Sequence, residues 1–88
     1  MNQTILVVED DQLTRQLISD HLTEAGFQVV EAADGEEAKD VFLEEHPCLI
    51  VLDLVLPKLS GEELFQWIRK QERNEVSIII LSAKASTQ

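Results

Sequence analysis

A carboxylate stands inside one of the most apolar stretches of this chain, the run LIVLDLVLP that begins at Leu49. Asp53 follows four apolar residues and precedes three more. A buried carboxylate without a partner costs several kcal/mol, so a plain hydrophobic strand does not explain it. We therefore expect that the strand ends at Asp53, which leaves the carboxylate accessible, and that a cation meets it there.

A second group of acids, Glu9, Asp10 and Asp11, comes directly after another apolar run, residues 4–8. Asp11 is more typical of a helix N-cap than of a ligand, and a single acid at a strand end is usually solvated. If Glu9 and Asp10 lie near Asp53, however, the charges repel one another unless a cation is present. Carboxylate oxygens with no His or Cys nearby in the sequence suit Mg²⁺.

An aspartate beside Mg²⁺ can act as a nucleophile and form an aspartyl-phosphate. The metal would offset the negative charge of the attacking carboxylate and of the phosphoryl group. Ser82 ends the last apolar run of the chain. Its hydroxyl could donate a hydrogen bond to a phosphoryl oxygen, although a serine at a strand end is more often only structural. The residues thus indicate phosphoryl transfer to Asp53.

Strand-like and helix-like stretches alternate along the whole chain. The strand-like stretches are residues 4–8, 27–32, 48–53 and 76–83. The helix-like stretches, with apolar residues at helical spacing, are residues 12–26, 34–47 and 59–72. The apolar positions of the first helix are Leu13, Leu17, Ile18, Leu22 and Ala25. We expect Asp11 to cap this helix and Gly26 to end it, and Ser60 with Glu63 matches the capping box S-x-x-E.

This alternation predicts one α/β domain over residues 1–88, a doubly wound parallel sheet with helices on both faces. Such sheets bind ligands at the carboxyl ends of their strands. In the strand order 1-2-3-4 the first and third strands would lie about 10 Å apart. In the order 2-1-3-4 they are neighbours, and Glu9, Asp10 and Asp53 share one crevice. We favour the second order because it gives the acids a common purpose, although the sequence does not decide it.

Charge and composition exclude several functions. Seventeen acidic against seven basic residues give a net charge of −10, so this chain alone is not expected to bind DNA or RNA. No apolar run approaches the length of a membrane span, and the first residues lack the basic region of a signal peptide. The single cysteine, Cys48, is expected to be an inert buried thiol and fits a cytoplasmic protein.

Four motifs together resemble the receiver domain of bacterial two-component response regulators: ILVVEDD, AADGEEA, DLVLPKLSGEEL and IIILSA. The resemblance covers the whole chain and implies a flavodoxin-like receiver with strand order 2-1-3-4. It implies a phosphoacceptor signalling domain, which assists its own phosphorylation and dephosphorylation and is not a conventional enzyme. The phosphoryl donor would be a sensor histidine kinase.

The resemblance also implies a role for individual residues. Asp53 would be the phosphoacceptor, and Glu9 and Asp10 match the acidic pair that holds Mg²⁺. Asp53 itself and the backbone carbonyl of Val55 would be further metal ligands. Ser82 matches the Ser or Thr that follows the phosphoryl group when the domain switches.

Compared with the family, the sequence ends before a fourth helix, a fifth strand and a fifth helix. These elements carry the family's Lys and the surface that usually dimerises or meets an output domain. We therefore expect a C-terminally truncated receiver whose output domain, DNA-binding in many such proteins, lies outside this chain. The fourth strand would have an open apolar edge. We expect a homodimer or another association through that edge.

Two other functions stay open. A receiver-like interaction module would bind partners without switching by phosphorylation. A Mg²⁺-dependent phosphohydrolase of the haloacid-dehalogenase-like type would also use an aspartate nucleophile, but it places a second Asp two residues later, where this chain has Val55. Mg²⁺ binding and phosphate uptake would separate the phosphoacceptor from the interaction module.

Overall fold

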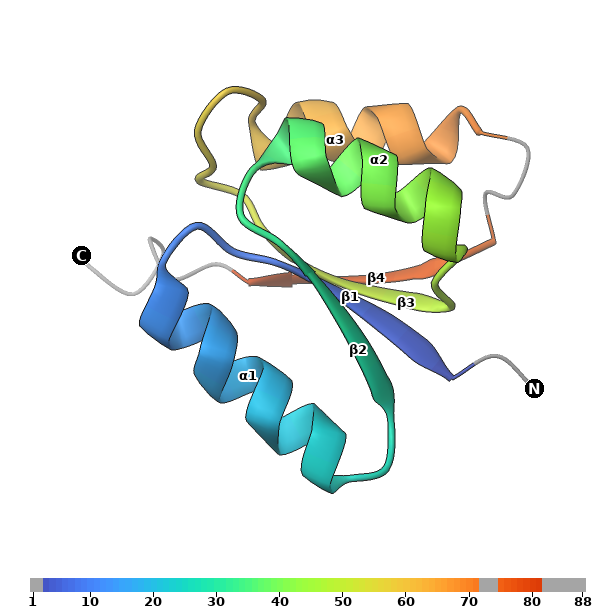
Figure 1. The fold of residues 1–88 in the computed structure, drawn as a ribbon. Helices are drawn as coiled ribbons and strands as arrows, with labels where there is room; N and C mark the ends of the chain where they lie inside the picture. The colour runs from blue at the N-terminus through green and yellow to red at the C-terminus, as the bar shows by residue number, and fades with distance from the viewer. Residues whose placement is uncertain (1–2, 72–74, 82–88) are drawn as a thin grey trace.

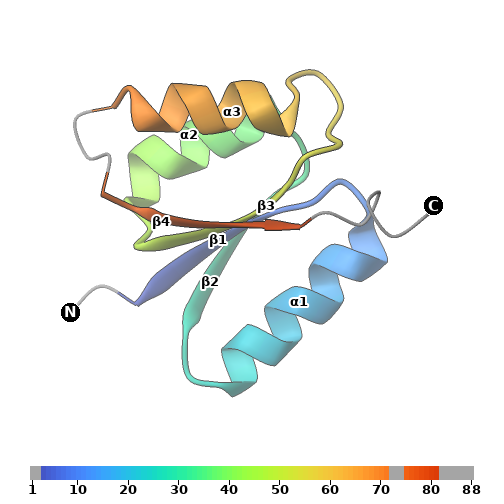
Figure 2. The ribbon, with the colours of Figure 1, turned by 180° about the vertical axis from the view of Figure 1, so that it is seen from behind.

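Four strands and three helices alternate along the chain in the computed structural model, which describes residues 3–71 and 75–81. The strands are β1 (Thr4–Val8), β2 (Gln28–Ala32), β3 (Leu49–Asp53) and β4 (Ser77–Leu81). The helices are α1 (Gln12–Glu24), α2 (Gly35–Glu45) and α3 (Gly61–Arg69). Helices α2 and α3 cover one face of the sheet and α1 covers the other (Figures 1 and 2).

All strand pairs are parallel, and their order is β2-β1-β3-β4. The order 2-1-3-4 favoured from the sequence is therefore confirmed. Val8, the last residue of β1, pairs with Ala32 on one side and with Leu52 on the other. The acids that follow Val8 and Leu52 consequently leave the sheet at the same edge.

The sheet carries a hydrophobic core on each face. Strand β1 is buried along its whole length, since it lies in the middle of the sheet between both helical layers. The core toward α2 and α3 contains the fully buried side chains of Leu6, Val8, Ile50, Leu52, Leu64 and Ile68. The core toward α1 is smaller and contains Ile5, Val7 and Val51. These two cores hold β1 and β3 side by side.

Helix α1 packs through fewer apolar residues than its sequence pattern indicates. Ile18 and Leu22 contact the core toward α1, and Ser19 is buried beside them. Leu13 and Leu17 are 81% and 59% exposed. Helical spacing alone therefore overstated the buried face of this helix, because the sheet beneath it covers only the stripe around Ile18 and Leu22.

The helix ends are formed by the residues that the sequence indicated. Asp11 caps α1 by accepting a hydrogen bond from the Thr14 backbone N–H at 2.9 Å. Gly26 follows α1 with a φ of +100°, which glycine adopts without strain. Ser60 and Glu63 form both hydrogen bonds of a capping box at the start of α3.

The thiol of Cys48 is exposed, so the expectation that it is buried was wrong. Cys48 precedes β3, which begins at Leu49, and lies in the turn after α2. Its backbone is nevertheless tied to the sheet, since its N–H donates to the Thr4 carbonyl at 2.9 Å and its carbonyl accepts from Ser77.

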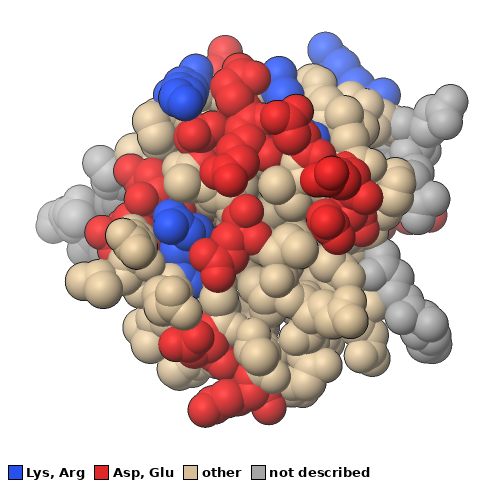
Figure 3. All heavy atoms as spheres, viewed as in Figure 1, with Lys and Arg blue, Asp and Glu red and all other residues tan. Residues whose placement is uncertain are grey.

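Most of the acidic excess lies on solvated helix surfaces. Figure 3 shows acidic side chains gathered over the face that carries α2. The exposed acids of α2 are Glu36, Glu37, Asp40, Glu44 and Glu45. Among the helices of residues 3–71 and 75–81, none combines the length and the apolar character needed to cross a bilayer.

Gly61 fixes the start of α3 directly against the end of β3. A Cβ at this position would lie 2.5 Å from the Leu54 Cα and 2.6 Å from the Asp53 carbonyl oxygen. The Gly61 N–H also donates to the Leu54 carbonyl at 3.0 Å. Any larger residue must therefore push the chain after Asp53 away from the helix.

We expect Gly61→Ala to lower the free energy of unfolding by about 2 kcal/mol, because the added methyl overpacks against backbone that cannot rotate away. Urea unfolding followed by circular dichroism measures this loss. Glu62→Ala, at an exposed position in the same helical turn, is the control and should change stability far less. Equal effects of the two substitutions would show that the close approach at Gly61 carries no strain.

Candidate functional site

Three carboxylates meet at the carboxyl edge of the sheet. Glu9, Asp10 and Asp53 each offer an oxygen, and these oxygens all lie within 4.8 Å of one another. Glu9 is buried, Asp53 is half-buried and Asp10 is exposed. The structure thus brings together the acids that the sequence singled out at the ends of the first and third strands.

The backbone places Glu9 and Asp53 where the chain leaves the sheet. The Glu9 N–H makes a last sheet-like bond to the Ala32 carbonyl at 3.1 Å, and the Glu9 carboxylate accepts from the Asp11 N–H at 3.1 Å. Oδ1 of Asp53 accepts from the Val55 N–H at 3.1 Å. Each carboxylate therefore accepts a hydrogen bond from the backbone N–H two residues later, which restricts its orientation.

Among the described residues, no Lys or Arg forms an ion pair with a carboxylate of the cluster. Burial raises the pKa of Glu9 from its ordinary value of 4.5 to about 7, the hydrogen bond from the Asp11 amide opposes this rise, and the nearby Asp53 and Asp10 carboxyls add to it. The two ion pairs found in the described part of the chain, Arg15–Glu31 and Lys58–Asp34, use acids outside the cluster.

The donor set fits Mg²⁺. It consists of carboxylate oxygens, which are hard ligands, and one member is exposed, so that water and a further ligand have access. A divalent cation would relieve both the burial and the mutual repulsion that disfavour ionised Glu9. The chemistry of the donor set, rather than the acidity of the surface, makes this a candidate metal site.

Other residues singled out in the sequence lie in different places. Val55 follows β3 in the loop and touches Asp53 through its backbone N–H. Asp11 belongs to the N-cap of α1 and not to the carboxylate cluster. Ser82 lies outside the described residues, but Leu81 directly before it pairs with Asp53 in the sheet.

The loop after Asp53 is held against the start of α2. Lys58 adopts a left-handed conformation with a φ of +70°, and its ammonium lies 3.5 Å from the Asp34 carboxylate. Asp34 also caps α2, and the Glu37 amide followed by Lys58 lowers the pKa of its carboxyl. Leu59 fills the space above Gly35, where a Cβ would lie 2.5 Å from the Leu59 Cβ. The loop beside the carboxylate cluster is therefore packed.

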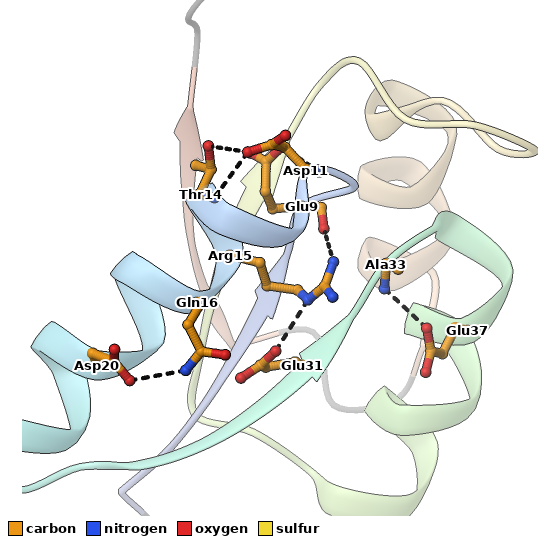
Figure 4. A network of polar contacts seen from close by, with 9 residues as sticks. All are labelled: Glu9, Asp11, Thr14, Arg15, Gln16, Asp20, Glu31, Ala33 and Glu37. Atoms are coloured by element: carbon orange, nitrogen blue, oxygen red, sulfur yellow. Dashed lines mark hydrogen bonds and ion pairs between the residues drawn. The ribbon is translucent and has the colours of Figure 1, made fainter.

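Arg15 carries no sequence pattern that indicates its contacts. Its guanidinium donates to the Glu9 carbonyl at 2.9 Å and to the Glu31 carboxylate at 3.0 Å (Figure 4). The sequence places Arg15 four residues after the N-cap Asp11, which gives no sign that the side chain turns back toward β1. Only the pairing of β1 with β2 brings these acceptors within its reach.

Comparisons with known proteins agree on one family. The family model described as the response regulator receiver domain matches residues 5–88. A probable transcriptional regulator, ycf27 of Porphyridium aerugineum, is 44% identical over 92% of this chain and 33% of its own length. The polar-differentiation response regulator DivK of Brucella ovis is 33% identical over 97% of this chain and 70% of its own length.

Solved structures give the same result. The receiver domain of the sensor histidine kinase PA1611 from Pseudomonas aeruginosa, determined with a magnesium ion coordinated in the active site cleft, matches with a TM-score of 0.90 and 34% identity. That match covers 99% of this chain and 72% of the other. The chemotaxis protein CheY4 of Vibrio cholerae matches with a TM-score of 0.86 and 30% identity, over 91% of this chain and 68% of the other.

The extent of these matches differs between relatives. The chain spans 33% of the length of the ycf27 relative but 70% of DivK, so the shared part is the receiver module and not the whole regulator. The fold, the strand order and the carboxylate cluster all lie within this module. The chain belongs to the family of response regulator receiver domains.

Proposed function

We propose that this chain is a phosphoacceptor signalling domain in which Asp53 receives a phosphoryl group in a Mg²⁺-dependent reaction. Glu9, Asp10 and Asp53 hold the metal, together with the backbone carbonyl of Val55. The convergence of the carboxylates from two neighbouring strands carries this proposal. The magnesium ion in the cleft of the similar PA1611 receiver domain supports the choice of metal.

In this proposal the two oxygens of Asp53 have distinct tasks. Oδ1 is engaged by the Val55 N–H, which fixes the carboxylate, and the second oxygen is the nucleophile. This oxygen forms a bond to phosphorus while the bond from phosphorus to the donor breaks, and the donor leaves with that electron pair. Bound Mg²⁺ would offset the negative charge that gathers on the carboxylates and the phosphoryl oxygens.

Partners and the switch residue belong to the same proposal. The donor is the phosphohistidine of a sensor histidine kinase, and the phosphorylated chain acts on an output domain, as the resemblance to transcriptional regulators suggests. Ser82 accompanies the phosphoryl group. The pairing of Asp53 with Leu81 supports this role, because Ser82 directly follows Leu81 in the sequence. The chain assists its own phosphorylation and dephosphorylation rather than turning over a substrate.

Incubation with a small phosphodonor such as acetyl phosphate is expected to add one phosphoryl group in the presence of Mg²⁺. Intact-mass spectrometry detects the adduct. Asp53→Asn should abolish it, since the amide is not a nucleophile. Asp10→Asn should reduce it strongly, because a metal ligand is lost. Asp11→Asn is the control: it keeps a capping oxygen outside the cluster and should be phosphorylated normally.

The same experiment separates the alternatives. A chain that binds Mg²⁺ but takes up no phosphoryl group would be a receiver-like interaction module. Steady release of phosphate from many substrates would indicate a phosphohydrolase instead. An adduct that survives in Asp53→Asn would overturn the assignment of the acceptor.

Without metal, Glu9→Gln is expected to raise the free energy of unfolding by about 1 kcal/mol near pH 8, after allowance for solvent screening. The folded chain carries the higher pKa of Glu9, about 7 against 4.5, so the carboxylate destabilises it above pH 7. As the pH falls from about 7 toward 4.5, this penalty disappears, and the stabilising effect of Gln disappears with it. Urea unfolding at both ends of the range measures the difference.

Magnesium should make wild type more stable than Glu9→Gln, which reverses the order of stability expected without metal. Wild type gains stability from bound metal by mass action, whereas Glu9→Gln lacks one ligand and gains less. Glu44→Gln, which removes an exposed acid of α2, is the control and should respond to Mg²⁺ like wild type. If the order of stability of wild type and Glu9→Gln is the same with and without Mg²⁺, a metal site at Glu9 is contradicted.

Self-association through β4, whose outer edge pairs with no other strand among the described residues, is the last part of the proposal. Ile79 and Ile80 of this edge strand are 52% and 43% exposed. Ile79→Lys should shift the chain toward monomer in sedimentation velocity, because a charge at an edge strand opposes pairing. Leu43→Lys on α2, where the leucine is also 52% exposed, is the matched control. A monomeric wild type at high concentration would refute this association.

A further inference from the structure

We propose that Arg15 is a positioning residue for the metal site: its guanidinium anchors the peptide bond that joins Glu9 to Asp10. The inference rests on the proposed function, since it concerns the same metal site. It assigns a role to a residue of α1 that does not belong to the carboxylate cluster.

Arg15 reaches two other elements from the first turn of α1. Its backbone N–H donates to the Asp11 carbonyl at 2.9 Å, so its own position is fixed by the helix. One terminal N–H donates to the Glu9 carbonyl at 2.9 Å, and Nε donates to Glu31 on β2 at 3.0 Å. Figure 4 shows the guanidinium between these acceptors. The Arg15 side chain is only 17% exposed.

The anchored carbonyl belongs to a peptide unit with a candidate ligand on each side. This unit is planar, so holding its oxygen fixes the ψ of Glu9 and the φ of Asp10 together. The Glu9 N–H is already held by the Ala32 carbonyl at 3.1 Å. Arg15 supplies the other anchor, and the directions in which both carboxylates leave the backbone depend on it.

Glu31 explains why an arginine suits this position. Glu31 pairs with Val7 in the sheet, and its carboxylate holds Nε while the terminal N–H turns toward Glu9. A planar fork makes two hydrogen bonds in fixed directions, which a lysine ammonium on a flexible stem does not reproduce. The hydrogen bonds of Arg15 therefore connect α1 to β2 and to the end of β1.

The space beside Arg15 makes its removal informative. An open cavity of about 160 Å³ lies here and is lined by Arg15, Glu31, Ala32, Ala33 and Glu37. In Arg15→Ala, water would fill this space and solvate the Glu9 carbonyl, so the core stays intact. The carbonyl would lose its fixed donor but not its hydrogen bonding, and the peptide would gain freedom.

The sign of the effect on Mg²⁺ binding distinguishes positioning from charge. If Arg15 acted only as a nearby positive charge, its removal would strengthen Mg²⁺ binding to the acids. If it positions them, its removal weakens binding. By analogy with residues that orient metal ligands, we expect Arg15→Ala to raise the Kd for Mg²⁺ about tenfold, and Arg15→Lys to raise it by a smaller factor because one hydrogen bond is kept.

Isothermal titration with MgCl₂ measures these constants on wild type, both Arg15 variants and Gln16→Ala. Gln16 is a control on the same helix, since its side chain bonds Asp20 and not β1 or β2. The backbone ¹⁵N shift of Asp10 without metal gives a second readout, which should move in both Arg15 variants and stay in Gln16→Ala. Urea unfolding confirms that each variant is folded.

Each outcome has a definite meaning. If wild type binds no Mg²⁺, the proposed metal site fails. If wild type binds and Arg15→Ala binds equally or more tightly, only the role of Arg15 fails. If Arg15→Ala does not fold, Arg15→Lys decides: a Kd and an Asp10 shift equal to those of wild type overturn the inference, and a weaker Kd with a moved shift supports it.

Discussion

The repulsion between Glu9, Asp10 and Asp53 is the constraint on which the rest of this structure depends. Their oxygens lie within 4.8 Å of one another, and Glu9 is buried. Such an arrangement is unfavourable by itself, so other parts of the fold must offset it. The buried core residues of β1 and β3 do so, because they hold the two strands in register right up to the acids.

The elements around the cluster restrict its loops. The close approach of Gly61 fixes the chain after Asp53, and Lys58 with Leu59 holds the same loop against the start of α2. On the other side, Arg15 connects the end of β1 to α1 and β2. These contacts restrict the loops that carry the carboxylates, and such preorganisation would favour the binding of a strongly hydrated ion such as Mg²⁺.

A family relationship and a function are supported by different observations in this protein. The matches to receiver domains cover nearly the whole chain and show the family. The function of a particular chain still depends on its own site residues. Here the acids at the ends of β1 and β3 converge and Asp53 is held by the Val55 amide, and these two observations support the proposed role of Asp53.

The sequence by itself determined the alternation of strands and helices, the caps at Asp11 and Ser60, and which acids end the strands, because local pattern and capping chemistry encode these features. It left the strand order open between 1-2-3-4 and 2-1-3-4. Tertiary packing decided that order, the exposure of Cys48 and of Leu13, and the hydrogen bonds of Arg15. These features depend on which distant segments become neighbours, and hydrophobic periodicity carries no information about the neighbour. The local sequence therefore determines which carboxylates stand at the strand ends, and the tertiary structure determines that they converge.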